Sequence, residues 1–452
     1  MTAETSNDKP LLVALAFPAP GHMQGLLQIT RHLVSRGFTV HFIAGTEFEA
    51  SVGKTGAHYI ENPRDWRVTR PNPADSNRDM FDDLKHVFAD STPAIFSILR
   101  DTLERLREQH PDREILILQD TMAQGVAPFK YGAALPKGYT SFPKVISFHP
   151  SIYVTKDYSI PPFGPGLPYD PTPENLAMWR SIYDAIDPQL DSLNSYFHEI
   201  YKTLGAMTPP TKPLFDSVLD MGEVTIMATT PSLEYPVANM NPKVRFVGGL
   251  PLKPLDPAYV YPEWWSTITE NARLPNASPD KKHVVFVSQG TVHLDYREMI
   301  TTAIAALSSR EDLIVIVTLG SPGEKPPADL VIPDNTKIID YLPYDATLPY
   351  TDVFISNAGY GGFMHGIMNG VPMVLSGAVA DKAEVCARGE WAGVAVNLRS
   401  QSPSAEAIRE GVDKILGNPK YKARALELKR ENEERNSLES IERIVEEVWK
   451  SG

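Results

Sequence analysis

Apolar and polar positions follow one another along the chain in blocks that predict buried parallel strands separated by amphipathic helices. Residues 11–17 form an unbroken apolar run, which is typical of a strand buried on both faces. Prolines and a glycine interrupt the pattern at residues 18–22, and residues 23–35 then place leucine, isoleucine and valine at helical spacing. Gly37 ends that helix and a second strand follows at residues 39–44, which completes a βαβ unit. Two further strands are predicted at residues 115–119 and 145–148.

The same alternation begins again in the second half of the chain. A strand is predicted at residues 283–287, a polar loop at 288–294, a helix at 296–308 and another strand at 313–319. Two doubly wound α/β domains are therefore expected, with ligands at the carboxyl ends of their strands. The stretch between them is rich in proline, and the C-terminus is charged and helical. The expected parts are a first domain at residues 1–235, a linker at 236–280, a second domain at 281–425 and a final helix at 426–452 that returns to the first domain.

Composition and charge narrow the classes of function. The 452 residues include 43 basic and 56 acidic side chains, and the net charge of −13 repels phosphate backbones and anionic lipids. A single cysteine, Cys386, cannot form an internal disulfide or a thiolate zinc cluster. The first ten residues are too polar for a secretory signal, and no apolar run approaches the ~20 residues that cross a membrane. We expect a cytoplasmic protein without nucleic-acid or membrane partners, with a monomer favoured.

Two side chains at the ends of predicted strands in the first domain are candidates for acid–base chemistry. His22 follows the first strand in a turn of prolines and glycine, where an imidazole can act as a general base. Asp120 ends the strand at residues 115–119, and a carboxylate there can hold one imidazole nitrogen while the other accepts a proton. The alternatives are a surface or helix-capping histidine and a helix N-cap aspartate. A dyad requires that the two side chains meet.

Two loops of the second domain are suited to a phosphate group. Ser288, Gly290 and Thr291 follow the first strand of that domain with small side chains, hydroxyls and free amides. Residues 357–362, Asn-Ala-Gly-Tyr-Gly-Gly, follow a strand at 353–356 and open a helix, so backbone amides can cradle a diphosphate at the positive helix end. A plain turn with an N-cap, or a glycine-rich turn without a ligand, explains the same residues. The second loop matches neither a dinucleotide fingerprint nor a Walker A loop.

Four motifs together carry a resemblance to a known family. They are Tyr341-Leu342-Pro343, residues 352–362, Gly370-Val371-Pro372 and Ala380-Asp381-Lys382. They resemble the nucleotide-sugar signature of family 1 glycosyltransferases of the GT-B fold, and the resemblance spans nearly the whole chain. The Asn-Ala-Gly-Tyr-Gly-Gly block with a later Asp-Lys pair is similar to that of soluble microbial and fungal members. The resemblance implies an α/β fold in which two Rossmann-like domains face each other across a cleft.

The resemblance also implies a role for each candidate residue. His22 matches the base that deprotonates an acceptor hydroxyl, Asp120 matches the residue that balances the imidazolium, and inversion at the sugar carbon follows. Tyr341 matches the aromatic that stacks on uracil, and the Leu342 backbone matches the group at the base edge. The expected donor contacts are Ser288, Gly290, Thr291, Tyr341, Leu342, Asn357, Gly359, Tyr360, Gly361, Gly362 and His365 for the nucleotide and diphosphate, and Asp381 and Lys382 for the sugar.

Three positions depart from the family pattern. Asn357 stands where a diphosphate-binding histidine is usual, so a possible cation becomes a neutral amide donor and about 1 kcal/mol of charge assistance is lost. His365 replaces the glutamate with which many members grip the ribose hydroxyls, and this leaves ribose contact open. Lys382 replaces the usual glutamine and can still donate to a sugar hydroxyl or a phosphate, which leaves the donor sugar open.

The resulting expectation is an inverting transferase that moves a sugar, glucose above all, from a UDP-sugar to a hydroxyl of a small apolar or aromatic acceptor such as a phenolic. Aromatic and proline-rich loops offer Phe148, His149, Tyr153 and Phe163 as acceptor contacts, with simple packing as the alternative. A base and diphosphate donors suffice for the chemistry and no D-x-D triplet precedes a strand end, so neither a metal nor a cofactor is expected. The alternative functions are a nucleotide-sugar-binding protein without transfer activity and a GT-B-fold sugar-nucleotide epimerase.

Overall fold

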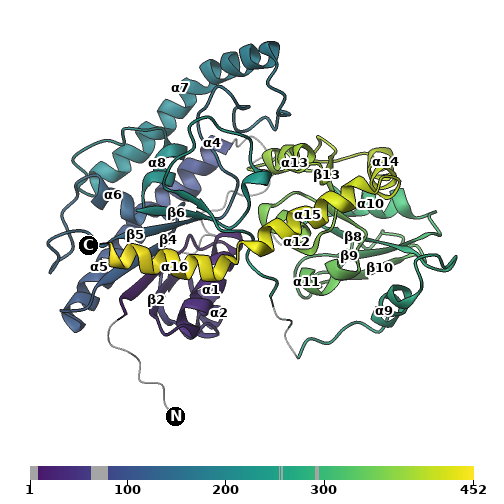
Figure 1. Cartoon of the computed structure of the whole chain (residues 1–452), viewed down its shortest axis with the longest axis horizontal. Helices are drawn as coiled ribbons and strands as arrows, with labels where there is room; N and C mark the ends of the chain where they lie inside the picture. The colour runs from purple at the N-terminus through teal and green to yellow at the C-terminus, as the bar shows by residue number, and fades with distance from the viewer. Residues whose placement is uncertain (1–8, 63–79, 254, 256–257, 291–294, 452) are drawn as a thin grey trace.

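A computed structural model describes residues 9–62, 80–253, 255, 258–290 and 295–451 of the chain. The described residues form two α/β domains that lie next to each other, the N-terminal one in purple to teal and the C-terminal one mainly in green (Figure 1). Each domain is built on one parallel sheet, which confirms the predicted pair of doubly wound domains. Within the described ranges, none of the helices combines the length and the apolar character that a membrane crossing requires.

The N-terminal sheet runs in the order β3-β2-β1-β4-β5-β6-β7. Its strands are β1 Leu11–Leu15, β2 Thr39–Ala44, β3 His58–Glu61, β4 Ile115–Asp120, β5 Val145–His149, β6 Val224–Met227 and β7 Val244–Phe246. In β1 the side chains alternate between two cores, with Leu11, Val13 and Leu15 on one face and Leu12 and Ala14 on the other. Burial on both faces explains why the strand appears in the sequence as an unbroken apolar run.

Helices cover both faces of the N-terminal sheet. They are α1 Pro20–Ser35, α2 Glu49–Gly53, α4 Met80–Asp83, α5 Thr92–Gln109, α6 Ala127–Lys130, α7 Pro173–Thr203 and α8 Leu214–Asp220, with short 3-10 or π segments at Thr46–Phe48, Leu84–Phe88, Ala89–Ser91, Gln124–Val126 and Pro231–Leu233. α1 begins at Pro20, earlier than the predicted start at residue 23, because proline at the first helical position sacrifices no intrahelical hydrogen bond. His22 therefore lies in the first turn of a helix, which fixes its direction better than a loop does.

The C-terminal sheet runs in the order β10-β9-β8-β11-β12-β13. Its strands are β8 His283–Ser288, β9 Leu313–Thr318, β10 Thr336–Ile339, β11 Val353–Ser356, β12 Met373–Leu375 and β13 Ala395–Asn397. The helices around it are α9 Trp265–Arg273, α10 Ile300–Leu307, α11 Tyr344–Thr347, α12 Tyr360–Asn369, α13 Lys382–Trp391 and α14 Ala405–Leu416, with a 3-10 turn at Leu348–Tyr350. α10 is shorter than the predicted helix at 296–308. It begins at Ile300, whose N–H donates to Gln289 Oε1 at 2.9 Å.

The chain ends in two helices and not in the single one that the sequence predicts. α15 Lys420–Glu434 and α16 Ser437–Lys450 are separated at Asn436, whose left-handed φ of 47° breaks the helix. α15 packs on α12 of the C-terminal domain, whereas α16 crosses back to α1 (Figure 1). There Glu442 accepts hydrogen bonds from Arg36 and His32, both at 3.0 Å. The helix that returns to the first domain is therefore α16 alone.

The linker is shorter than the predicted residues 236–280, because β7 belongs to the N-terminal sheet and α9 packs in the C-terminal domain. The linker between β7 and α9 passes between the domains at the junction of α15 and α16. Gly249 donates its N–H to Asn432 Oδ1 at 2.8 Å, and its carbonyl accepts from Ser437 Oγ at 2.9 Å. The neighbouring Gly248 has a φ of 85°, and a Cβ there would lie 2.2 Å from the Asn432 carbonyl oxygen. Only glycine allows this close approach, so the two connections between the domains cross in direct contact.

Candidate active site

Both sheets reverse their strand order at one point, and the candidate residues gather there. In the N-terminal sheet the reversal lies between β1, which precedes His22, and β4, which ends in Asp120. In the C-terminal sheet it lies between β8 and β11, which lead into the loops after Ser288 and Ser356. Crevices at such points are the usual ligand sites of open α/β sheets. The topology therefore brings together residues that are far apart in the sequence.

His22 and Asp120 are in direct contact. His22 Nδ1 lies 2.7 Å from Asp120 Oδ2, and the Asp120 side chain is fully buried. Because a carboxylate can only accept, Nδ1 carries the hydrogen in the neutral imidazole, and Nε2 then presents its lone pair. Asp120 also accepts from the backbone N–H groups of Phe17 at 3.2 Å and Met122 at 3.0 Å. Asp120 thus meets both interpretations, as the partner of His22 and as a cap for the following turn.

The charges around His22 favour its protonated form. Burial lowers the pKa of His22, but the charge and the hydrogen bond of Asp120, together with the charge of Asp381, outweigh burial and hold the pKa above its ordinary 6.5. Asp381 belongs to the C-terminal domain, so the field at the imidazole comes from both domains. A raised pKa makes Nε2 a better proton acceptor, provided that the pH is high enough to keep it unprotonated.

Two aromatic rings border the imidazole on its apolar side. The ring centroids of Phe17 and Phe88 lie 5.4 Å and 5.6 Å from that of His22, and 4.6 Å from each other. Phe88 ends the π-helical turn Leu84–Phe88, an element that the sequence reasoning did not predict. The result is an imidazole whose side chain is 21% exposed, held by a carboxylate at one edge and flanked by phenyl rings.

The loop after β11 turns sharply into α12. Ala358 has a left-handed φ of 58°, and Gly359 caps the helix. The N–H groups of Tyr360, Gly361 and Gly362 belong to the first helical turn, where the helix itself provides no acceptor. Gly361 is exposed, and a Cβ added there would meet no atom within 4 Å. This helix end can receive an anion through its N–H groups and its dipole.

Asn357 and Ser288 shape the loops that flank this helix end. Asn357 Nδ2 donates to the Gln289 carbonyl, and the residue is 8% exposed, so the predicted diphosphate donor ties the two loops together in this structure. Ser288 Oγ lies 2.6 Å from the Tyr344 hydroxyl and accepts from the Gly290 N–H at 3.2 Å. The backbone amides of α12 are therefore better placed for a diphosphate than the Asn357 side chain is. Thr291 lies outside the described residues.

The predicted uracil contacts differ in accessibility. Tyr341, which follows β10, is 41% exposed, so its ring is open to a stacking partner. Leu342 is buried, and its N–H donates to Thr318 Oγ1 at 3.2 Å. A base edge at this position would therefore meet the Leu342 carbonyl.

The predicted sugar-binding pair lies at the boundary between the domains. Asp381 follows Ala380, whose left-handed φ of 56° turns the chain into α13. Its Oδ2 accepts a hydrogen bond from Ser151 Oγ of the N-terminal domain at 2.5 Å. Lys382 is buried, and its stem packs over Gly377, where a Cβ would lie 2.8 Å from Lys382 Cβ. The structure thus brings Asp381 to the same edge as His22.

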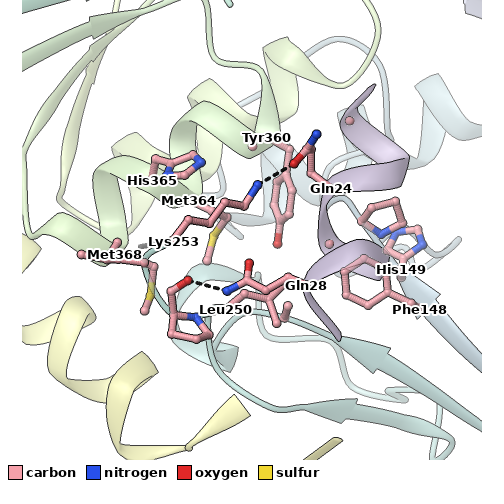
Figure 2. Close-up of a pocket in the computed structure, with 17 residues that line it drawn as sticks. Gln24, Gln28, Phe148, His149, Leu250, Lys253, Tyr360, Met364, His365 and Met368 are labelled. Atoms are coloured by element: carbon pink, nitrogen blue, oxygen red, sulfur yellow. Dashed lines mark hydrogen bonds between the residues drawn. The ribbon is translucent and has the colours of Figure 1, made fainter. Parts of the chain in front are cut away.

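A cavity of about 130 Å³ lies between α1, the linker and α12 (Figure 2). Lys253 of the linker reaches into it, and its Nζ donates to Gln24 Oε1 of α1 at 2.6 Å. Burial lowers the pKa of Lys253, although the charge of Asp345 opposes this shift. Gly361 of the α12 turn lines the same cavity. A cation thus borders the space in front of the helix end that suits an anion.

His365 faces this cavity rather than the helix packing. Its Nδ1 donates to Asp345 Oδ1 at 2.7 Å, and Asp345 Oδ2 accepts from the Lys253 N–H at 2.9 Å. Burial raises the pKa of Asp345, but its hydrogen bond and charge interaction with His365 leave it below the ordinary 3.8. With Nδ1 engaged, Nε2 of His365 is the acceptor that a ribose hydroxyl would meet.

The four candidate acceptor contacts separate into two pairs. Phe148 and His149 line the cavity. Tyr153 is 2% exposed and belongs to the core of the N-terminal domain, and Phe163 packs on Phe215 with ring centroids 5.2 Å apart. For Tyr153 the prediction of an acceptor contact is therefore corrected to a packing role, because its ring is buried in that core. Phe163 is only partly buried, and its acceptor contact stays a prediction.

His149 is fixed in its neutral form beside the site. Its Nδ1 accepts from Thr121 Oγ1 at 2.9 Å, and its Nε2 donates to the Ile152 carbonyl at 2.8 Å. Burial lowers the pKa of His149. With both ring nitrogens engaged, it holds the loop after β5 and offers no lone pair for base chemistry, which leaves that role to His22.

Sequence reasoning missed Lys253, Gln24, Asp345 and Phe88. Lys253 and Asp345 belong to no motif. Gln24 lies two residues after His22 in the predicted helix, and this proximity is the signal that could have found it. In the part of the chain that the structure describes, no group of three or more His, Cys, Asp or Glu side chains is arranged to hold a metal ion.

Comparisons with known proteins show the family of the chain and its fold. The family model described as "UDP-glucoronosyl and UDP-glucosyl transferase" matches residues 189–445. The chain is 38% identical to "UDP-glucosyltransferase 1" of Beauveria bassiana over 96% of this chain and 94% of that protein. It is 28% identical to "UDP-glucosyltransferase A1" of Starmerella bombicola over 98% and 93% of the two chains. The crystal structure of the "Glycotransferase of kitacinnamycin" shares the GT-B fold with a TM-score of 0.70 at 19% identity, covering 97% of this chain and 99% of that one.

Proposed function

Because the chain belongs to the family of UDP-glucoronosyl and UDP-glucosyl transferases, we propose that it moves glucose from UDP-glucose to a hydroxyl of a small apolar or aromatic acceptor such as a phenolic. The family makes it a UDP-glycosyltransferase that uses a UDP-sugar and a small acceptor. The choice of glucose is supported by the two fungal relatives. The apolar acceptor is supported by the phenyl ring of Phe88, which is only partly buried and lies 5.6 Å from the His22 imidazole.

In the proposed reaction His22 is the general base. Its Nε2 takes the proton of the acceptor hydroxyl while the oxygen attacks the anomeric carbon of the donor sugar. The bond between that carbon and the diphosphate breaks, and UDP leaves with the electron pair. Attack from the face opposite the leaving group inverts the configuration at this carbon. Asp120 stabilises the imidazolium that forms, as its 2.7 Å contact with Nδ1 allows.

The proposed donor site runs along α12 and needs neither a metal nor a cofactor. Tyr341 stacks on uracil, Nε2 of His365 accepts from a ribose hydroxyl, and the N–H groups at the start of α12 hold the diphosphate. Lys253 adds the positive charge that Asn357 does not carry. Together they stabilise the negative charge that develops on the departing UDP. Asp381 also accepts from a sugar hydroxyl, beside the hydrogen bond that its Oδ2 accepts from Ser151.

The pair of His22 and Asp120 in the field of Asp381 is the observation that carries this proposal. In the test, the protein is incubated with UDP-glucose and a panel of phenols, and products are followed by mass spectrometry. A glycoside together with UDP supports transfer, whereas unchanged donor indicates a binding protein and an altered sugar nucleotide indicates an epimerase.

A variant then tests the base. His22→Ala should lower turnover about 10²–10⁴-fold, the usual contribution of a general base, and leave the Kd for UDP within about threefold. His283→Ala is the control, because His283 is half exposed and begins β8, at the end of the strand opposite to Ser288 and the site. Turnover of His22→Ala within about threefold of the parent would refute the assignment.

A further inference from the structure

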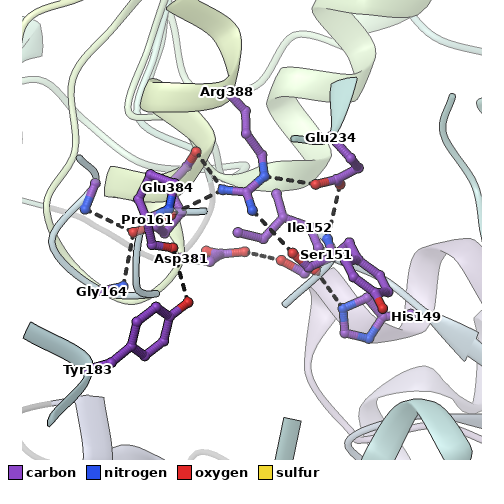
Figure 3. Close-up of polar contacts among 12 residues, drawn as sticks. His149, Ser151, Ile152, Pro161, Gly164, Tyr183, Glu234, Asp381, Glu384 and Arg388 are labelled. Carbon is purple, nitrogen blue, oxygen red and sulfur yellow. Dashed lines mark hydrogen bonds and ion pairs between the residues drawn. The ribbon is translucent and has the colours of Figure 1, made fainter. Parts of the chain in front are cut away.

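One arginine joins the two domains beside the sugar-binding pair. Arg388 lies on α13 and is 4% exposed. Its Nε donates to Glu234 Oε2 at 2.8 Å, its Nη1 to Glu384 Oε2 at 3.0 Å and its Nη2 to the Tyr153 carbonyl at 3.1 Å. Glu384 lies on the same helix, and Figure 3 shows Arg388 between Glu384 and Glu234. Glu234 and Tyr153 belong to the N-terminal domain. The guanidinium also lies 4.4 Å from the centre of the Tyr235 ring.

Both carboxylates extend this contact to the backbone of the N-terminal domain. Glu234 Oε1 accepts from the Tyr153 N–H at 3.0 Å. Glu384 Oε1 accepts from the N–H groups of Gly164 at 2.9 Å and Gly166 at 2.8 Å. A Cβ at Gly166 would lie 2.7 Å from a backbone oxygen in the first turn of α13, so the two backbones touch. One arginine and its carboxylates therefore hold three points of a single loop.

This loop, residues 151–166, follows the predicted acceptor contacts Phe148 and His149 in the chain and is named the acceptor-side loop below. It begins two residues after His149, which lines the cavity and donates to the Ile152 carbonyl. Ser151 is its first residue and donates to Asp381, the residue that immediately precedes α13. The loop is therefore attached to the sugar-binding helix near both of its ends.

Stability alone is a weak explanation for this cluster. The cost of removing a guanidinium and its carboxylate partners from water roughly cancels their attraction. The planar guanidinium instead imposes direction, because its N–H groups point along fixed lines. The arrangement is suited to setting the position of one backbone segment relative to another.

We propose that Arg388 is a positioning residue that sets the acceptor-side loop against α13, so that the acceptor hydroxyl and the anomeric carbon of the donor stay in line. This inference rests on the proposed transfer reaction, and Arg388 itself touches neither substrate. When the loop is displaced, water attacks the anomeric carbon in place of the acceptor, and the products are free sugar and UDP. Arg388 thus favours transfer over hydrolysis of the donor.

Three variants test the proposal. Arg388→Met removes the charge and the directed N–H groups, and Arg388→Lys restores one cation without the planar group. Glu384→Gln keeps an oxygen for the glycine N–H groups and weakens the ion pair, so it serves if Arg388→Met does not fold. Arg399→Met is the matched control. Arg399 pairs at 2.7 Å with Glu390 of α13, the helix that also carries Arg388, and both side chains of this pair are exposed.

The main readout is the ratio of donor hydrolysis to transfer, measured by free sugar and glycoside per UDP released. We expect Arg388→Met to lower kcat/KM for the acceptor about 10²-fold, as a displacement of about 1 Å does, and to raise the ratio at least about tenfold. The Kd for UDP should stay within about threefold, and Arg388→Lys should recover part of the transfer. If transfer and hydrolysis fall in equal proportion, the role is structural and the proposal is refuted.

Hydrogen exchange separates this proposal from the proposed function. Amides of the acceptor-side loop should exchange faster in Arg388→Met and Glu384→Gln than in the parent or in Arg399→Met, whether or not the chain transfers sugar. Unchanged exchange in that loop would overturn the positioning role even if the parent makes glycosides.

Discussion

Replacing Asp120 by asparagine tests how the buried carboxylate supports His22 as the general base. The Asp120 carboxylate is fully buried and accepts from three donors, namely His22 Nδ1 and the N–H groups of Phe17 and Met122. Asparagine has the same shape but only one accepting atom, so its NH2 group must face either His22 and Phe17 or Met122. If it faces His22, the hydrogen moves to Nε2 and the lone pair that takes the acceptor proton is lost.

The expected loss follows from two separate effects. A wrong tautomer removes general base catalysis, which is worth about 10²–10⁴ in rate. A neutral partner also no longer balances the imidazolium, and this raises the barrier further. The fold should survive, since one unpaired buried donor costs about 1–3 kcal/mol.

The pH profile provides a second and independent signature. Asp120 contributes to holding the pKa of His22 above 6.5, against the effect of burial. Activity of the parent should therefore fall as the pH drops through this raised pKa, because His22 becomes protonated. In Asp120→Asn the pKa of His22 falls, so the acid limb should move to lower pH.

The assay is kcat and kcat/KM from UDP release between about pH 5 and 9, with the Kd for UDP as a check on donor binding. Asp345→Asn is the matched control, because Asp345 forms the other His–Asp contact of 2.7 Å, with His365 on the donor side. It should weaken donor binding and leave the acid limb in place. An Asp120→Asn variant with a kcat within threefold of the parent and an unmoved acid limb would refute the reasoning.

Three further predictions concern the donor site and the fold. Lys253→Met should raise the Kd for UDP about tenfold and leave the Kd for uridine unchanged in calorimetry, because the lost charge borders the cavity in front of the helix end proposed for the diphosphate. Equal losses for both ligands would contradict this. Gly361→Val should abolish UDP binding while leaving Tm within a few degrees, since the added side chain meets no protein atom but fills the space of the anion. Glu442→Gln should lower Tm at pH 7. Arg36 and His32 hold the pKa of Glu442 below its ordinary 4.5 against the effect of burial, so the stabilising effect of the carboxylate is lost on acidification. The Tm difference between parent and variant should therefore shrink below about pH 4.5.

Much of the fold could be predicted because parallel strands buried on both faces leave unbroken apolar runs. β2 Thr39–Ala44 and β11 Val353–Ser356 coincide with the predicted strands. Helix ends were less accurate, because they depend on local details of the backbone. α1 starts earlier at Pro20, and the left-handed Asn436 divides the final helix in two.

Part of the site could be predicted from the sequence for a similar reason. His22 follows β1 and Asp120 ends β4, and these two strands are neighbours in one sheet, so the sequence already placed both residues at the same edge. Lys253 and Arg388 could not be found in this way. Lys253 meets Gln24 across 229 residues of chain, and Arg388 meets Glu234 across 154, so their roles arise from how the two domains are placed.

The configuration of the product tests the central claim most directly, namely that His22 deprotonates an acceptor which displaces UDP in one step. The parent is incubated with UDP-glucose, in which the sugar is α-linked, and a phenol, and the anomeric coupling of the first glycoside formed is measured by proton NMR. A β-glucoside whose formation is lost in His22→Ala is the expected result. An α-glucoside, or a β-glucoside formed equally well without His22, would contradict the account.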